Sequence, residues 1–130
     1  MKLEGRILLF DTVSKNRDIF PKDCEITIPE KLPLTWQFHH QEVIGMAEVI
    51  KDDLGLIAKV KITPNAHIKE EDLKSIFENG KFGVGGYYNK VKKHDAGSFI
   101  IIDKATLRSV SLVLAPVREE YYLKIVEEEM

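Results

Sequence analysis

Histidine and serine are the residue types in this chain that could support acid–base or nucleophilic catalysis. A catalytic serine needs a base within hydrogen-bond reach and a third group that orients the base. No serine here lies in the glycine-flanked turn of a nucleophile elbow. The local sequence therefore predicts no catalytic triad. The candidates are His39 and His40 among the histidines, and Ser14, Ser75, Ser98, Ser109 and Ser111 among the serines.

The same histidines could bind a metal ion together with His67 or His94. Adjacent residues of a strand point to opposite faces, so only one of His39 and His40 could serve a given ion. No cysteine or carboxylate stands at a spacing that would complete the ligand shell. We therefore expect no metal, and no other cofactor.

A glycine run, Gly83-Val84-Gly85-Gly86, could suggest a phosphate-binding loop. It lacks the lysine and serine of that motif, and no helix pattern follows it. Glycines inside a strand more often mark a bulge or a close approach of two backbones. We therefore expect these glycines to lie in a strand, at a bulge or a close approach of two backbones, and not in a phosphate-binding loop.

The elements that must position these groups centre on residues 31–62. A short strand over Leu34–Phe38 leads, through His39 and His40, into a hairpin. Its arms, Val43–Ile50 and Leu56–Ile62, are rich in β-branched residues, and Asp52–Gly55 has turn composition. Pro33 separates the first strand from the segment before it.

The rest of the chain predicts further strands and one helix. Ile68, Leu73, Ile76 and Phe77 share a helical face that ends at Asn79-Gly80. The fold expected is mainly β, an antiparallel barrel of about seven strands with a crossing helix. The other strands expected are Lys2–Phe10, Cys24–Ile28, Phe82–Val91, Phe99–Asp103 and Thr106–Leu114, with a loop over Asp11–Asp23.

The composition excludes several functional classes. The net charge of −2 over 130 residues gives no basic stripe for nucleic acid, and we interpret Lys90–Lys93 with His94 as a solvated hairpin end. No apolar run is long enough for a membrane span, and no signal peptide is recognisable. One cysteine, Cys24, excludes an internal disulfide. We expect a soluble intracellular protein.

Short motifs follow one another along the chain in a recognisable order. After the opening MKLEGRILLF, Leu34-Thr35-Trp36-Gln37-Phe38-His39 is followed by Ile44-Gly45 and by Asp53-Leu54-Gly55-Leu56. Gly83-Val84-Gly85 then follows the predicted helix, and Ser109-Val110-Ser111-Leu112-Val113-Leu114-Ala115-Pro116 precedes the tail. In this order the chain resembles the prohead proteases, the capsid-maturation proteases of tailed phages, which share a β-barrel with the herpesvirus assemblins. The resemblance covers Leu3 to Pro116.

The resemblance implies a serine-protease site, but the family's catalytic residues do not match this chain. The general-base histidine falls on Phe38 and its neighbouring aspartate on His39. The nucleophilic serine falls on Gly83. The third member, a glutamate in phage enzymes or a histidine in assemblins, falls on Ser109. Phenylalanine accepts no proton and glycine offers no nucleophile. A one-residue shift could make His39 the base only if a bulge turned it to the required face.

The resemblance and the unmatched positions together imply a non-catalytic phage or prophage relative of the prohead proteases. It would act by binding, as a structural or assembly factor of the capsid. Its partners would be capsid or scaffolding proteins or further copies of itself, without nucleic acid or membrane. We expect it in the bacterial cytoplasm, in the procapsid or in the virion. Residues 1–116 would form the β-barrel, and residues 117–130 an acidic tail that is either a helix or an added strand.

Two alternatives stay open. An active serine protease with a displaced site would use His39 or His40 as base and Ser111 or Ser98 as nucleophile. A generic β-barrel interaction module would share only its topology with the proteases. For binding, we expect the partner at a strand edge with exposed backbone, since such edges accept an added strand. The residues concerned are Gly83, Gly85, Gly86, Tyr87 and Tyr88, with a second surface at Tyr121 and Tyr122 of the tail.

Overall fold

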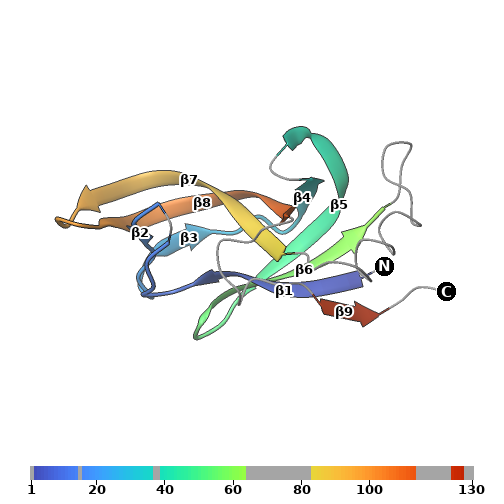
Figure 1. Ribbon diagram of the computed structural model, residues 1–130, viewed down its shortest axis with the longest axis horizontal. Coiled ribbons are helices and arrows are strands. Elements are labelled where there is room, and N and C mark those ends of the chain that lie inside the picture. The colour runs from blue at the N-terminus through green and yellow to red at the C-terminus, as the bar shows by residue number, and fades with distance from the viewer. Residues whose placement is uncertain (1, 15, 37–38, 64–82, 114–123, 128–130) are drawn as a thin grey trace.

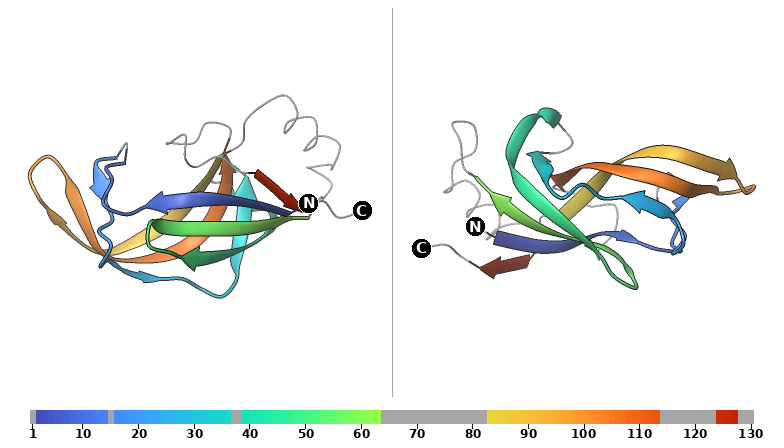
Figure 2. Two further views of the ribbon diagram at one scale, coloured as in Figure 1. Left: turned by 90° about the horizontal axis from the view of Figure 1, so that it is seen from below. Right: turned by 180° about the vertical axis from the view of Figure 1, so that it is seen from behind.

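The computed structural model describes residues 2–14, 16–36, 39–63, 83–113 and 124–127, and at 39–42 and 124–127 it describes the backbone alone. These residues form one nine-stranded sheet that curls into an open half-barrel (Figure 1, Figure 2). The mainly β class is therefore confirmed. Within the described ranges there is no helix, and so none long and apolar enough to span a membrane. The strands are β1 Lys2–Leu9, β2 Asp18–Ile19, β3 Glu25–Thr27, β4 Leu32–Trp36, β5 His39–Lys51, β6 Gly55–Ile62, β7 Gly83–Asp95, β8 Ile100–Val113 and β9 Lys124–Glu127.

The strands β5 and β6 form the predicted hairpin, and β1 adds antiparallel to β6. The carboxylate of Asp52 shapes the turn, because it accepts hydrogen bonds from the backbone N–H groups of Leu54 (3.0 Å) and Gly55 (2.8 Å). The two guanidinium nitrogens of Arg6 on β1 donate to the same carboxylate at 3.0 and 2.7 Å. Such bidentate charged hydrogen bonds fix geometry as well as adding stability. They hold the turn against β1.

The interior of this hairpin has room for backbone alone at one position. Gly45 on β5 lies opposite Ile62 on β6, and a Cβ atom at Gly45 would stand 2.0 Å from the carbonyl oxygen of Lys61. That distance is far below van der Waals contact, and a backbone oxygen cannot rotate away as a side chain can. Glycine is therefore required where β5 and β6 pass each other.

Strand β8 pairs with four of the other described strands. On one edge it pairs antiparallel with β7 over nearly its whole length. On the other edge it pairs in parallel with β2, β3 and β4, each at a different height. The expected antiparallel pairing is therefore found for β1, β4, β5, β6, β7 and β9, whereas the pairing of β8 with β2, β3 and β4 is parallel and was not expected. Each of the three short strands reaches β8 only through a long stretch of intervening chain, as parallel pairing requires.

Strand β8 is also continuous where two strands were expected. The sequence pattern breaks between Asp103 and Thr106 because β-bulges change which residues face the core. Asp103 and Arg108 are extra residues in β8, and Val91 is extra in β7. Each extra residue inverts the inside–outside alternation beyond it. The buried core positions of β8 accordingly run Ile102, Ala105, Leu107, Val110 and Leu112.

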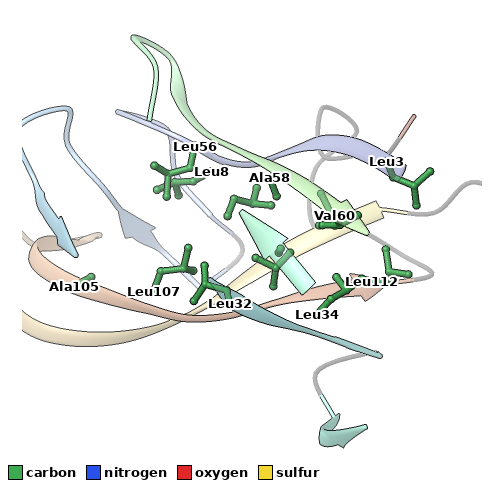
Figure 3. Close-up of a cluster of buried hydrophobic side chains, with 14 of the residues drawn as sticks. Leu3, Leu8, Leu32, Leu34, Leu56, Ala58, Val60, Ala105, Leu107 and Leu112 are labelled. Carbon is green, nitrogen blue, oxygen red and sulfur yellow. The ribbon is translucent and has the colours of Figure 1, made fainter. Parts of the chain in front are cut away.

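The core fills the concave side of the half-barrel. Figure 3 shows Leu34, Leu107 and Leu112, from β4 and β8, facing Leu56 and Val60 of β6 across the interior. These side chains are fully or almost fully buried. Truncating a buried leucine of this kind to alanine costs about 2–5 kcal/mol. This packing holds β4 and β8 in fixed positions for the groups described below.

Other expectations differ from the structure in detail. His39 and His40 belong to β5 and not to a connector before it. Pro33 lies inside β4, opposite Met46, and does not end a segment there. Of the tail, residues 124–127 form β9, which pairs antiparallel with β1. The predicted helix, with His67, lies outside the described residues, as do Phe38, Phe82 and residues 114–123, which include Tyr121 and Tyr122.

Candidate functional site

A row of hydroxyl groups lies where β4 and β8 run side by side. Thr35 is paired with Ser111, and both are buried, as is Ser109 two residues earlier on β8. The hydroxyl of Ser111 donates to the carbonyl oxygen of Thr35 at 3.2 Å. The hydroxyl of Thr35 donates to the carbonyl oxygen of Val110 at 3.4 Å. These bonds join the two strands, and they give the Ser111 hydroxyl a structural acceptor on β4.

The hydroxyl of Ser109 has a different environment. The residue is 4% exposed, and its Oγ has no hydrogen-bond partner among the described residues. A buried hydroxyl without a partner costs about 1–3 kcal/mol relative to one that is satisfied. Ser109 is the position to which the resemblance in sequence would assign the third catalytic residue. Among the described residues its hydroxyl has no base within hydrogen-bond distance.

The glycine run opens β7 as expected, inside a strand and without a following helix. Gly83 pairs with Val113, and Gly85 with Ser111. At Gly86 a Cβ atom would lie 2.7 Å from the Tyr88 hydroxyl oxygen, so glycine allows the tyrosine side chain to lie close to the backbone. The close neighbour of Gly86 is therefore a side chain, and not the second backbone that was expected.

The two tyrosines that follow the glycines have different exposures. Tyr87, opposite Ser109, is 46% exposed. The Tyr88 ring packs on the core and lies 5.0 Å from the Phe20 ring at 46°. This tilted arrangement is typical of favourable aromatic pairs. Of the two residues, Tyr87 is therefore the more exposed.

The resemblance would assign a protease triad to Phe38, Gly83 and Ser109; Phe38 lies outside the described residues, and the other two positions are apart on the sheet. Gly83 lies opposite Val113, four residues along β8 from Ser109, which is about 13 Å at strand rise. The backbone of His39 pairs with Trp36, and Trp36 with Leu112, so His39 is about 10 Å from β8.

Of the two serines that could serve a displaced catalytic site, Ser98 lies far from the histidine positions on β5. Ser98 lies in the exposed turn between β7 and β8, whereas Ser111 lies near the other end of β8. Ser111 lies eleven residues after Ile100, or nine paired positions when the bulge residues Asp103 and Arg108 are left out, which corresponds to about 30 Å. Ser98 therefore does not reach the histidine backbone positions on β5. For Ser111, the structure describes the Thr35 carbonyl acceptor but not the side chains of His39 and His40.

Metal-binding and thiol chemistry find little support in the part of the chain that the structure describes. No group of three or more histidine, cysteine, aspartate or glutamate side chains lies close enough there to hold an ion. His94 Nδ1 lies 2.6 Å from Asp103 Oδ2 on the exposed end of the β7–β8 arm, as an isolated pair. Cys24 is buried, and desolvation, followed by the nearby charge of Asp103, raises the pKa of its thiol to about 11. The thiol is therefore protonated and inert at neutral pH.

A cavity of about 460 Å³ lies over β1, β5 and β6, on strands away from the hydroxyl row. Its rim carries charges of both signs in cross-strand neighbours. Lys59 on β6 lies between Glu4 on β1 and Glu48 on β5. Opposite charges at such positions stabilise a sheet by a few tenths of a kcal/mol, up to about 1 kcal/mol. Alternating charges of this kind are typical of the outer, charged face of a sheet.

Sequence reasoning identified Ser109, Ser111 and the glycine edge but missed Thr35. The signal that joins Thr35 to Ser111 is their parallel register, and no local pattern reports a pairing over 76 residues. Comparison of the chain with protein-family models, with curated proteins and with solved structures finds no match in any of the three.

Proposed function

We propose that this chain is a non-catalytic relative of the prohead proteases that serves as a capsid-assembly binding factor in a phage or prophage. The observation that supports this proposal is the edge of β7 that pairs with no described strand. Among the described strands β7 has one partner, β8, although it is 13 residues long. An extended segment of a partner can add to such an edge through main-chain hydrogen bonds, with side-chain contacts giving specificity.

The near end of β7, from Gly83 to Tyr88, is the part assigned to the capsid partner. Gly85 has no side chain over its backbone, whereas the backbone at Gly86 lies against the Tyr88 side chain. Tyr87 is half-exposed beside them and offers a rigid aromatic surface, which is a common anchor at protein interfaces. Binding there would need no catalytic group, in accordance with glycine at position 83 and the structural hydrogen bond of Ser111.

The test is co-expression of this chain with the major capsid or scaffolding protein encoded beside it. We expect the two proteins to co-purify, with full-length intact masses for both. Tyr87→Ala should lower retention about tenfold, the usual size of a moderate hot-spot loss. Leu54→Ala, which removes another exposed apolar side chain from the β5–β6 turn, is the matched control.

Two outcomes would contradict the proposal. Defined partner fragments that disappear in a Ser111→Ala variant would mean an active protease. Full-length proteins that do not associate, with or without Tyr87, would leave no support for a capsid partner at this edge.

A further inference from the structure

Among the described strands, β7 offers the longest edge to a partner. Four of these strands pair with a single other strand, and three of the four, β2, β3 and β9, have only two to four residues. The distal half of β7, Asn89–Asp95, runs with β8 into an arm that extends past β1, β5 and β6 (Figure 1, Figure 2). A partner segment that pairs with the near end of β7 and stays extended therefore reaches this arm.

The arm is basic, although the chain as a whole is acidic. Residues 89–106 contain four lysines and two aspartates, which gives a net charge of +2 with His94 neutral, against −2 for the whole chain. Both aspartates have local partners. Asp95 Oδ1 accepts a hydrogen bond from the backbone N–H of Gly97 at 2.9 Å, and Asp103 Oδ2 lies 2.6 Å from His94 Nδ1. Within the described part of the chain, neither aspartate forms an ion pair with a lysine of the arm.

The lysines of β7 are only partly neutralised. Lys90 forms an ion pair with the buried carboxylate of Asp18 on β2. Lys92 and Lys93 are exposed and form no ion pair with any described residue. Two ammonium groups therefore stand without an anion beside the edge of β7 that no described strand covers.

These two lysines point to opposite faces of the arm. Lys93 lies opposite Ile102, whose side chain is buried in the core, and Lys92 lies opposite Lys104 on the other face. Lys104 has Glu25 of β3 on its other side, whereas no described strand supplies such a neighbour to Lys92. Because a strand alternates its side chains, two consecutive acidic residues beside the arm would bring one carboxylate to each lysine.

The edge and the charges together indicate the chemical class of the partner. An uncovered strand edge is completed by the N–H and C=O groups of a polypeptide, which a nucleic acid or a lipid does not supply. Lysines at such an edge oppose pairing with neutral or basic strands, and this protects the edge from indiscriminate association. The same lysines favour an acidic segment, so they give specificity by repulsion as well as by attraction.

We propose that the segment which adds to β7 is acidic, with two consecutive carboxylate side chains against Lys92 and Lys93 and the following residues paired antiparallel with Gly83–Tyr88. Antiparallel pairing is the more stable kind per residue, and it requires the acidic pair to precede the paired residues in the partner sequence. This inference rests on the proposed function, because it specifies the chemistry of the partner segment assigned to the near end.

The experiment is an NMR titration of the ¹⁵N-labelled chain with synthetic peptides of about twelve residues. The acidic peptide carries Glu-Glu near its amino terminus, followed by alternating threonine and valine, and the matched peptide carries Gln-Gln instead. We expect the acidic peptide to shift the amide signals of Gly85, Gly86, Lys92 and Lys93 and to bind about tenfold more tightly in about 0.05 M salt. This preference should shrink in about 0.5 M salt.

A charge swap separates loss of contact from loss of folding. The variant Lys92→Glu with Lys93→Glu should bind the acidic peptide about tenfold or more weakly than the parent, and it should prefer a third peptide that carries Lys-Lys. The control, Lys22→Glu with Lys31→Glu, makes the same change in net charge on exposed residues elsewhere and should bind the peptides like the parent.

The outcomes distinguish this inference from the proposed function. Equal binding of the acidic and glutamine peptides at the near end would overturn the inference and leave the edge site itself standing. No shift at the near end with any peptide would contradict the edge site, and the inference with it. An oligothymidylate that binds Lys92 and Lys93 as tightly as the acidic peptide would also overturn the inference, because the arm would then attract any polyanion.

Discussion

Replacing Ser109 by alanine should stabilise the fold, whereas the same replacement at Ser111 should destabilise it. The two serines are separated by one residue on β8, lie on the same face and are both buried. Their hydroxyls differ in one respect. That of Ser111 donates to the Thr35 carbonyl oxygen at 3.2 Å, and that of Ser109 has no partner among the described residues.

The expected magnitudes follow from that difference. Removing the unsatisfied hydroxyl of Ser109 recovers about 1–3 kcal/mol of desolvation cost, offset by about 0.5–1 kcal/mol of lost packing contacts. The net gain is about 1 kcal/mol. Removing the Ser111 hydroxyl forfeits a net hydrogen bond and leaves a buried carbonyl with one acceptor site unused, a loss of about 1 kcal/mol. The two variants should therefore differ by about 2 kcal/mol, or about 6 °C in Tm for a chain of this length.

Urea denaturation followed by tryptophan fluorescence measures this difference directly. Trp36 is the single tryptophan, is partly buried against the core, and lies next to Thr35 on β4. Equal m-values for the two variants would show that the unfolded states are comparable. If Ser109→Ala were destabilised as much as Ser111→Ala, the Ser109 hydroxyl would have a partner, and the argument from an unsatisfied group would be refuted.

Three further predictions concern stability and reactivity. Gly45→Ala should lower the free energy of unfolding by about 3 kcal/mol or more in chemical denaturation, because its Cβ would collide with the backbone of Lys61. The control Gly97→Ala should lower it by about 1 kcal/mol, because Gly97 has φ +85° but open space around it. Equal losses for the two variants would contradict the close approach of β5 and β6 at Gly45. The hydrogen bond from Arg6, followed by those of the turn N–H groups, holds the pKa of Asp52 below its ordinary value of 3.8. The stabilisation from Asp52 is therefore complete well above pH 3.8 and is lost as the pH falls below that value. In urea titrations at several pH values, the free energy of unfolding of Asp52→Asn should fall by about 1 kcal/mol less on acidification than that of the parent. Cys24 should resist alkylation at about pH 8 while folded and react on unfolding, as followed by intact mass; fast native labelling would contradict its burial and raised pKa.

The sequence was most informative where strands pair with their neighbours along the chain. The turn of the β5–β6 hairpin and the strand β6 are predicted to within one residue, whereas β5 begins at His39, four residues before the predicted arm; Asp52 and Gly55 carry recognisable turn chemistry and the arms are rich in β-branched residues. Strand β1 is predicted to within one residue, and its buried and half-buried positions alternate from Lys2 to Ile7, before a bulge at Ile7 brings Leu8 to a buried position as well. In both cases local alternation or turn chemistry marks most of the element.

Prediction failed where bulges or distant pairing control the structure. In β8 the extra residues Asp103 and Arg108 shift the alternation, so one strand reads as two. The end of β7 is exposed on both faces, and no burial pattern marks its extension to Asp95. The pairing of Thr35 with Ser111 could not be predicted from the sequence either, because the register of β4 on β8 is set by tertiary packing and not by local propensity.

The parallel pairing of β4 with β8 also imposes an order on folding during synthesis. Thr35 and Val110 are 75 residues apart, so β4 cannot complete its pairing until β8 has left the ribosome. The β5–β6 hairpin closes over a short loop and can form long before that. In the interval, the edge of β4 that β8 will occupy is exposed to other nascent chains. Pro33 lies within that strand and has no N–H to donate, which makes the waiting strand a poorer template for aggregation.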